Sequence, residues 1–333
     1  INPSIKDVRL SKDLNADCIE IHTGRISNLI KKNKFYKSEL RKIIKVVRYA
    51  DNLGIEVHAG HGMDYKTAKI LSKIKGIKEF NIGHFIIGES VFFGLKKTIK
   101  IFKSIKIMRP SNRNINQIRP VSIKTDIIKN AEGSCNIKCG NTEIICTATI
   151  DENVPHFIRK TGLGWVTAEY GMLPRSTNSR MKRESSRGKQ GGRTLEIQRL
   201  IGRSLRTCVD RLLLGERQII IDCDVIQADG GTRCAAITGG WIALKLASDH
   251  LVKNQIIDEN PIINQVAAIS CGIYNDEPIL DLDYEEDSNV KTDANFVLNQ
   301  KNEIIEIQVS AEKDPFSFKD FEKLFELSKG GIE

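Results

Sequence analysis

Two Gly-Gly pairs, each beside an arginine at the start of an apolar helical pattern, are the residues best suited to hold an anion. Gly191-Gly192 is followed by Arg193, and a second pair lies in the segment 228–233, Ala-Asp-Gly-Gly-Thr-Arg, after the strand-like run 219–225. Glycine lets the backbone approach a ligand closely, and the first N–H groups of a helix can bind an anion. Because arginine adds paired donors that match phosphate oxygens, we expect an oxyanion site.

A strand-like run, 278–283, leads into an acidic turn. Residues 281–290 contain five acidic side chains and no basic one. Asp281 and Asp283 would share one face of a strand, because strand side chains alternate, and Asp287 could return toward them. Grouped carboxylates suit a hard divalent cation such as Mg²⁺. The alternative is an acidic surface loop, and the two anion sites favour the metal site.

Positive charge is concentrated between Arg175 and Arg206, where ten Lys and Arg accompany two Glu. The first part, 175–189, is polar and has no hydrophobic periodicity, so we expect a long loop. Release of counterions makes such a loop a good sequence-independent grip on a nucleic-acid backbone. The alternative, a merely solvated loop, is weakened because the loop leads directly into the first Gly-Gly-Arg site.

The sequence downstream of residue 107 lacks the residue patterns of several common classes of enzyme. Its histidines are His156 and His250, and neither lies in a nucleophile–base arrangement. We find neither a P-loop nor a dinucleotide fingerprint. Over the whole chain, eight cysteines form no zinc-site spacing and no apolar run is long enough for a membrane span, so we expect a reduced, cytoplasmic protein. Anion sites with a metal indicate a transfer in which a bound phosphate or water attacks.

The region 108–333 resembles the ribonuclease PH family of phosphorolytic exoribonucleases. The motifs that carry the resemblance are 108–111, 131–134, 164–175, 188–193, 222–233 and 281–287. The resemblance implies a ribonuclease PH-type α/β domain that forms a hexamer, a trimer of dimers, and trims tRNA 3′ ends with inorganic phosphate, releasing nucleoside diphosphates. Two departures are Gln308-Val-Ser-Ala-Glu312, where the family has Gln-Gly-Thr-Ala-Glu, and a C-terminus short of the usual tail.

The same resemblance assigns roles to individual residues. It implies that Arg193 and Gly231, Thr232 and Arg233 hold the attacking phosphate. Asp281 and Asp287 would be the catalytic carboxylates and the Mg²⁺ ligands. The residues implied to contact tRNA lie in the basic loop and are Arg175, Arg180 and Arg183.

The upstream region has strand-like runs at 18–24, 55–61 and 80–84, and helical patterns at 35–53, 67–74 and 85–107. Strands that alternate with helices predict a parallel sheet. The first and second runs end in Gly and His, and the third contains Gly83-His84, as at the ends of (β/α)₈ barrel strands, where such enzymes keep their chemistry. A single histidine of this kind is often a satisfied polar residue, but three make a site the better interpretation.

Residues 1–106 resemble the C-terminal part of the pyridoxine 5′-phosphate synthase family, a barrel enzyme of vitamin B6 synthesis. The matching motifs are 19–24, 57–62, 81–84 and 86–88, with His58 where the family has Asn. The resemblance implies that His61 is a proton donor and that Gly62, Gly83 and His84 are substrate and phosphate contacts. Only three strands are clear, so we expect a partial (β/α)₈ barrel fragment that is inactive unless another chain completes it.

These signatures predict two domains, 1–107 and 108–333, of mixed α/β and α+β class. The first has a net charge of +12 and the second of −3, so the overall +9 does not itself indicate RNA binding. Met108-Arg-Pro reads like the start of a reading frame, whereas residue 1 is Ile. A fusion, a frameshifted neighbour and a gene-calling error all remain open. The alternative functions are a non-catalytic RNA-binding ring subunit and pyridoxine 5′-phosphate synthesis.

Overall fold

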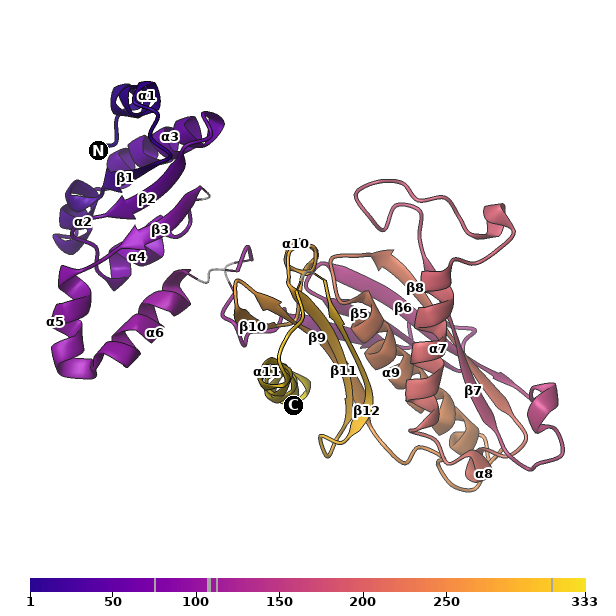
Figure 1. Cartoon of the computed structure of the whole chain (residues 1–333). Coiled ribbons are helices and arrows are strands. Elements are labelled where there is room, and N and C mark those ends of the chain that lie inside the picture. The colour runs from indigo at the N-terminus through magenta and orange to yellow at the C-terminus, as the bar shows by residue number, and fades with distance from the viewer. Residues whose placement is uncertain (75, 107–108, 112, 313) are drawn as a thin grey trace. The chain divides into compact units, whose positions relative to one another are not determined.

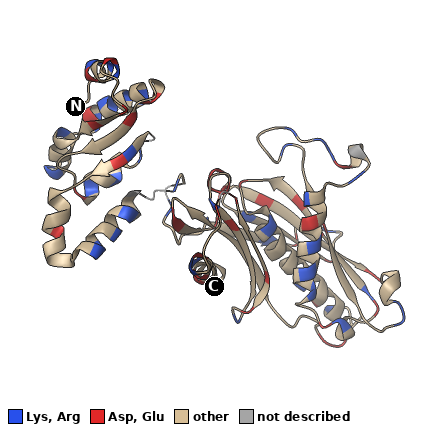
Figure 2. Cartoon of the chain, viewed as in Figure 1, with Lys and Arg blue, Asp and Glu red and all other residues tan. Residues whose placement is uncertain are grey.

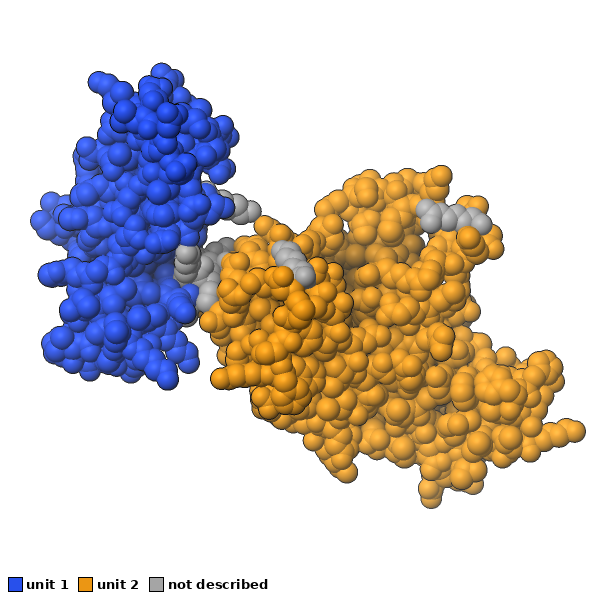
Figure 3. All heavy atoms as spheres, viewed as in Figure 1, with its two compact units in different colours: residues 1–108 blue, residues 109–333 orange. Residues whose placement is uncertain are grey.

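The computed structural model describes residues 1–74, 76–106, 109–111, 113–312 and 314–333. It divides into two compact units, Ile1–Met108 and Arg109–Glu333, which are coloured separately in Figure 3. The predicted boundary at Ile107–Met108 itself lies outside the described residues. Within the described ranges, no helix is both long and apolar enough to cross a membrane.

Unit 1 is built on a parallel sheet in the order β1-β2-β3, formed by Cys18–His22, Glu56–Gly60 and Ile77–Asn81. Register pairs include Ile19 with Val57 and Ala59 with Phe80. Side chains alternate along β1, where Ile19 and Ile21 are buried. The predicted parallel arrangement is therefore confirmed. The described residues of this unit contain these three strands and no closed barrel, so a barrel fragment remains a prediction.

Helices flank the sheet of unit 1 (Figure 1). Their bounds are α1 Ile5–Asp13, α2 Gly24–Lys31, α3 Lys37–Asn52, α4 Tyr65–Leu71, α5 His84–Phe93 and α6 Leu95–Lys106. The prediction of a single helix over 85–107 is wrong. Gly94 interrupts the helix, because its φ of +80° lies in the left-handed region. The last residue of that prediction, Ile107, is not among the described residues.

Unit 2 contains a mixed five-stranded sheet in the order β4-β5-β6-β8-β7, in which only β7 and β8 pair in parallel. The strand bounds are β4 Val121–Thr125, β5 Gly133–Cys139, β6 Thr142–Asp151, β7 Trp165–Met172 and β8 Gln218–Gln227. Alternate residues of β8, beginning with Ile219 and Ile221, are buried in the core. The predicted strand 219–225 is thus the centre of β8.

A second, antiparallel sheet follows in the order β10-β9-β11-β12, with bounds Glu277–Leu280, Val266–Tyr274, Thr292–Asn299 and Ile304–Ala311. The long helix α9, Thr232–Lys253, packs on β5 and β6 of the first sheet and on β9 of the second. Burial from both sides explains why most residues of this helix are apolar. Figure 1 shows it enclosed between the sheets.

Shorter helices complete unit 2. They are α7 Gly192–Arg206, α8 Arg211–Leu214, α10 Tyr284–Asp287 and α11 Phe318–Ile332, with 3₁₀ turns at His156–Ile158 and Ser185–Arg187. Helix α7 packs against β7 and α9, and α11 packs on β9 and β10. The two apolar helical patterns that follow the Gly-Gly pairs correspond to α7 and α9. The segment between β7 and α7 is the long loop predicted from its composition.

Candidate active site

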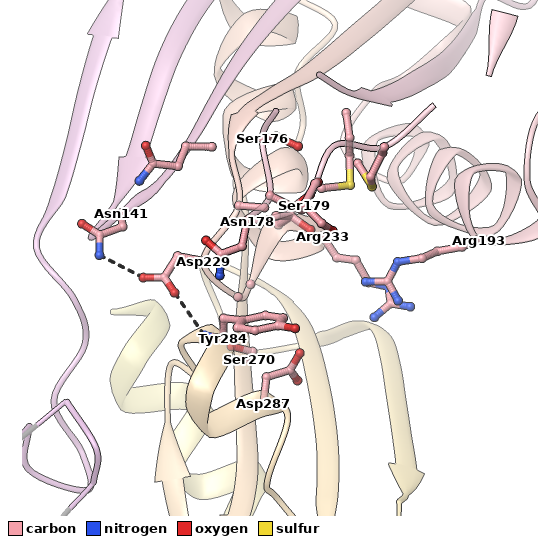
Figure 4. Close-up of a pocket in the computed structure, with 18 of the residues that line it drawn as sticks. Asn141, Ser176, Asn178, Ser179, Arg193, Asp229, Arg233, Ser270, Tyr284 and Asp287 are labelled. Carbon is pink, nitrogen blue, oxygen red and sulfur yellow. Dashed lines mark hydrogen bonds between the residues drawn. The ribbon is translucent and has the colours of Figure 1, made fainter. Parts of the chain in front are cut away.

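A polar pocket of about 840 Å³ in unit 2 gathers residues from distant parts of the chain (Figure 4). Its walls come from the connection between β8 and α9, the loop after β7, the start of α7, and the segments around α10 and β11. A second pocket, of about 810 Å³, has five residues in common with the first: Arg193, Arg233, Asp287, Asp293 and Asn295. These residues therefore lie where the two cavities adjoin.

The turn before α9 has the backbone conformation that its glycines permit. Gly230 and Gly231 have φ values of +75° and +66°, in the left-handed region. A Cβ atom on Gly230 would lie 2.5 Å from the carbonyl oxygen of Leu282, so this position has no room for a side chain. Gly231 caps α9 and brings the free N–H groups of its first turn to the pocket.

The two arginines of the Gly-Gly-Arg motifs face the same pocket. Arg193 extends from the first turn of α7 and is exposed, and Arg233 extends from the first turn of α9. Their side chains converge in Figure 4. Arg233 also makes an ion pair with Glu196 at 3.1 Å. The structure thus brings all four predicted phosphate residues, Arg193, Gly231, Thr232 and Arg233, to one cavity.

Two carboxylates, Asp287 at the end of α10 and Asp293 on β11, line both pockets together with the arginines. Burial and the negative charge of Asp287 raise the pKa of Asp293 to about 6, although Arg233 opposes the shift. Asp287 is exposed at the pocket. Partial loss of hydration raises the pKa of its carboxyl group, although the positive charges of Arg193 and Arg233 oppose this shift. The pocket therefore holds two carboxylates whose ionisation a bound cation would favour.

Asp281 does not lie in this cluster, and the expectation that it shares a strand face with Asp283 is wrong. Strand β10 ends at Leu280, and Asp281 has a φ of +55°, so the alternation of a strand does not continue. The Asp281 carboxylate is buried and accepts hydrogen bonds from Arg119 and Arg113. It lines neither pocket. Two arginines already occupy its oxygens, which leaves it poorly placed as a metal ligand.

The side chain of Asp283 stabilises the start of α10. It accepts a hydrogen bond from the N–H of Glu286 and forms a capping box at the start of α10. Asp293, by contrast, is a pocket carboxylate that sequence reasoning missed. The sequence carried only a weak signal, a single acid among the Thr, Asn and apolar residues of β11, Thr292–Asn299.

The basic loop approaches the pocket from one side. Arg175 lines the pocket, whereas Arg180 and Arg183 are exposed farther along the loop. The loop is tied to the start of α7 because Glu184 accepts hydrogen bonds from the N–H of Gly191 and from Thr194. Figure 2 shows further Lys and Arg along α7. This surface and the anion site are thus continuous.

The predicted residues of unit 1 lie where parallel strands end. His61 and Gly62 follow β2, and the ring of His61 stacks on that of His22 with centroids 4.2 Å apart. Gly83 and His84 begin α5 after β3. The hydroxyl of Thr23 donates to the carbonyl of His61 at 2.8 Å, which anchors the turn after β2.

No group of three or more His, Cys, Asp and Glu arranged to hold a metal ion occurs in the part of the chain that the structure describes. The two pocket carboxylates alone would leave most positions around a cation to water and to substrate oxygens, as is usual for Mg²⁺.

Both units match known protein families in sequence. Profiles described as "3' exoribonuclease family", domains 1 and 2, match residues 117–248 and 264–331, and one described as "Pyridoxal phosphate biosynthesis protein PdxJ" matches 1–108. Ribonuclease PH of Roseobacter denitrificans is 60% identical over 225 residues, which cover 68% of this chain and 95% of that protein. Ribonuclease PH of Cereibacter sphaeroides is 59% identical with the same coverage.

Solved structures share the fold at lower identity. Rrp46 of rice, Oryza sativa, is 20% identical with a TM-score of 0.55, covering 67% of this chain and 94% of that one. The Archaeoglobus fulgidus exosome with RNA bound to the active site is 18% identical with a TM-score of 0.59, covering 73% and 96%.

The family models that match 117–248 and 264–331 therefore make unit 2 a 3′ exoribonuclease domain, and its two-sheet α/β fold is that of the solved exosome structures. At 60% identity over nearly the whole length of its relative, the chain belongs to the ribonuclease PH family. It carries in addition a segment that matches the pyridoxal phosphate biosynthesis family.

Proposed function

We propose that unit 2 trims RNA from the 3′ end by phosphorolysis, with tRNA as the main substrate. Inorganic phosphate attacks the last phosphodiester, the bond to the 3′ oxygen of the preceding nucleotide breaks, and a nucleoside diphosphate leaves. The proton that hydrogenphosphate loses is the one that the 3′ oxygen gains, so the step is balanced and reversible. The observation that carries this proposal is the convergence of Arg193, Arg233, Asp287 and Asp293 beside the glycine turn.

Phosphate would be held by groups that already converge on the pocket. The first turn of α9 offers backbone N–H donors and a partial positive charge, and Arg193 and Arg233 offer charged donors. A binding site already arranged in this way lowers the barrier by holding the attacking oxygen near the reacting phosphorus.

The donor set fits Mg²⁺, and Asp287 and Asp293 would hold it with water and phosphate oxygens completing the shell. When bound, the ion neutralises charge on the reacting phosphate groups. The raised pKa of Asp293, which burial and Asp287 cause, supports this assignment, since a cation would stabilise both carboxylates in ionised form. Asp293 takes the place expected for Asp281.

RNA would be held by the basic loop through Arg175, Arg180 and Arg183. A non-catalytic RNA-binding ring subunit is the weaker candidate, because the pocket retains both its arginines and its carboxylates. A hexameric ring, the expected assembly of the family, is part of this proposal.

The test is product analysis with a tRNA that carries extra 3′ nucleotides. The full chain with Mg²⁺ and inorganic phosphate should release nucleoside diphosphates, and release should stop when phosphate is withheld. Nucleoside monophosphates formed without phosphate would indicate hydrolysis and contradict the proposal. RNA binding with no product under either condition would favour the non-catalytic subunit.

We further propose that residues 1–107 form a separate domain, a partial barrel with a remnant site at His61, Gly62, Gly83 and His84. The segregation of unit 1 from unit 2 supports this division. In the full chain, His61→Ala should leave phosphorolysis unchanged. A clear loss of nucleoside diphosphate release in that variant would show that unit 1 contributes to the activity.

A further inference from the structure

We propose that the buried ion pair between Arg119 and Asp281 positions the glycine turn 229–231 for phosphate binding. Asp281 would then act on phosphate affinity without touching phosphate or metal, and Arg119 would be a positioning residue. This inference rests on the proposed function of the same pocket. It assigns a role to two charged residues that lie outside the pocket lining.

Arg119 donates to both carboxylate oxygens of Asp281, and Arg113 adds one hydrogen bond from Nη1 to Oδ2 at 3.0 Å. The backbone N–H of Arg119 donates to Oδ2 at 2.6 Å, its Nε donates to the same oxygen at 2.9 Å, and its Nη2 donates to Oδ1 at 2.6 Å. Arg119 is 6% exposed and Asp281 8% exposed. Breaking such a pair leaves an uncompensated buried charge, so the geometry of Arg119 is strongly fixed.

The same guanidinium also holds the turn. Nη1 donates to the carbonyl oxygen of Asp229, and Nη2 lies 3.5 Å from the carbonyl oxygen of Gly230. The buried hydroxyl of Thr142 donates to that second carbonyl at 2.7 Å and accepts from the N–H of Asp229 at 3.0 Å. The carbonyl groups of Asp229 and Gly230 are therefore both held on the side of the turn that faces Arg119.

Peptide geometry links these carbonyls to the anion site. In a planar trans peptide the C=O of one residue points away from the N–H of the next. Fixing the carbonyls of Asp229 and Gly230 toward Arg119 therefore directs the N–H groups of Gly230 and Gly231 to the other side of the turn, which carries the pocket wall. A Cβ on Gly231 would lie 3.0 Å from Nη2 of Arg119, so the guanidinium packs closely beneath the turn.

Arginine is required here for its shape. A planar fork can serve a carboxylate and two carbonyls at once, whereas a lysine ammonium offers three donors around one point. Arg119→Lys thus keeps the charge and loses the shared geometry. Asp281→Asn keeps the shape of the side chain and loses the charge that holds the guanidinium.

The experiment measures inorganic phosphate binding by calorimetry and steady-state phosphorolysis in Arg119→Lys, Asp281→Asn and the wild type. We expect the Kd and the KM for phosphate to rise about tenfold, the loss of one or two hydrogen bonds. The kcat at saturating phosphate, the KM for tRNA and the Mg²⁺ concentration for half-maximal activity should stay within about twofold. In the double variant the two effects should be less than additive, since both substitutions disrupt the contact between Arg119 and Asp281.

Arg206→Lys is the matched control, because Arg206 also donates to a backbone carbonyl, that of Val166, and does not line the pocket. It should leave phosphate affinity unchanged. If Arg119→Lys does not fold, Thr142→Val removes the other hydrogen bond to the Gly230 carbonyl and should raise the Kd for phosphate in the same way.

The outcomes separate this inference from the proposed function. Unchanged phosphate affinity in folded variants, or a loss of kcat with an increased Mg²⁺ requirement in Asp281→Asn, would overturn the positioning role while phosphorolysis itself stands. A wild type that binds phosphate but releases no nucleoside diphosphate would refute the function. In that case weaker phosphate binding by Arg119→Lys would still support the positioning role.

Discussion

Arg109 and Glu286, 177 residues apart in sequence, form a buried ion pair through two hydrogen bonds of 2.7 and 2.6 Å. Both side chains are fully buried, and Arg113 adds a third contact to Glu286 at 2.9 Å. Because Glu286 precedes Asp287 on α10, this pair fixes the helical turn that presents a pocket carboxylate. The start of unit 2 is thereby connected to the wall of the pocket.

Glu286→Gln should destabilise unit 2 by about 3–5 kcal/mol, because it leaves Arg109 buried without its charge partner. Both tryptophans of the chain, Trp165 and Trp241, lie in unit 2, so their fluorescence during urea unfolding reports on this unit alone. Glu322→Gln, at an exposed position of α11, is the control and should change stability little. Equal stability of the two variants would contradict the role assigned to the pair.

Asp281 should make unit 2 sensitive to acid. Burial raises the pKa of its carboxyl group, but the hydrogen bonds and charge of Arg119 outweigh burial and lower it below the ordinary value. The folded state therefore binds fewer protons than the unfolded state, and the stability from Asp281 is lost as the pH falls through the ordinary carboxyl range, about 4, and below. Urea unfolding from pH 6 to 3 should show a flatter decline for Asp281→Asn.

The difference between wild type and Asp281→Asn measures the contribution of Asp281 to the pH dependence of stability. Asp293, whose pKa is raised to about 6, favours the folded state at low pH and is present in both proteins. Parallel stability curves for Asp281→Asn and wild type would mean that Asp281 keeps its ordinary pKa in the folded protein.

Arg193→Gln should raise the KM for inorganic phosphate about 10- to 100-fold, because hydrogen bonds to a charged partner contribute about 1.5–3 kcal/mol. The KM for tRNA should change much less. Arg199→Gln, an exposed change farther along α7, tests for a general effect of charge on that helix. An unchanged KM for phosphate in Arg193→Gln would remove Arg193 from the phosphate site.

Arg180→Ala and Arg183→Ala should each weaken tRNA binding and reduce the slope of log K against log salt by about 0.7–0.9 per lost phosphate contact. The affinity for inorganic phosphate should be unaffected, since neither residue lines the pocket. Filter binding across a salt series provides the measurement, with Lys319→Ala at an exposed position of α11 as the control. Salt slopes equal to that of the wild type would mean that the loop does not grip RNA.

Local sequence patterns predicted the elements that depend on local physics. The glycine turn before α9 and the apolar helix after it were recognisable because glycine φ preferences and helical periodicity are local properties. The basic loop was recognisable from its charge and its lack of periodicity. The break at Gly94 was not, because the apolar residues of 84–93 suit a continuous helix equally well.

The carboxylates show where local reasoning ends. Asp281 has the composition of a metal ligand, but its environment is set by Arg119, which lies 162 residues away in sequence. Asp293 was missed because a single acid in a strand of mixed polar and apolar residues forms no distinctive local pattern. Its partnership with Asp287 and Arg233 arises only when β11 pairs with β9 beside the start of α9.

The most direct test of the account is release of nucleoside diphosphates by Asp287→Asn from a tRNA with extra 3′ nucleotides, at saturating phosphate and Mg²⁺. Glu285→Gln, an exposed change on the same turn, serves as the control. We predict that Asp287→Asn lowers the rate about 100-fold or more while tRNA binding survives, and that the control keeps its activity. Nucleoside diphosphate release by Asp287→Asn at the rate of the control would contradict the assignment of this pocket as the catalytic centre.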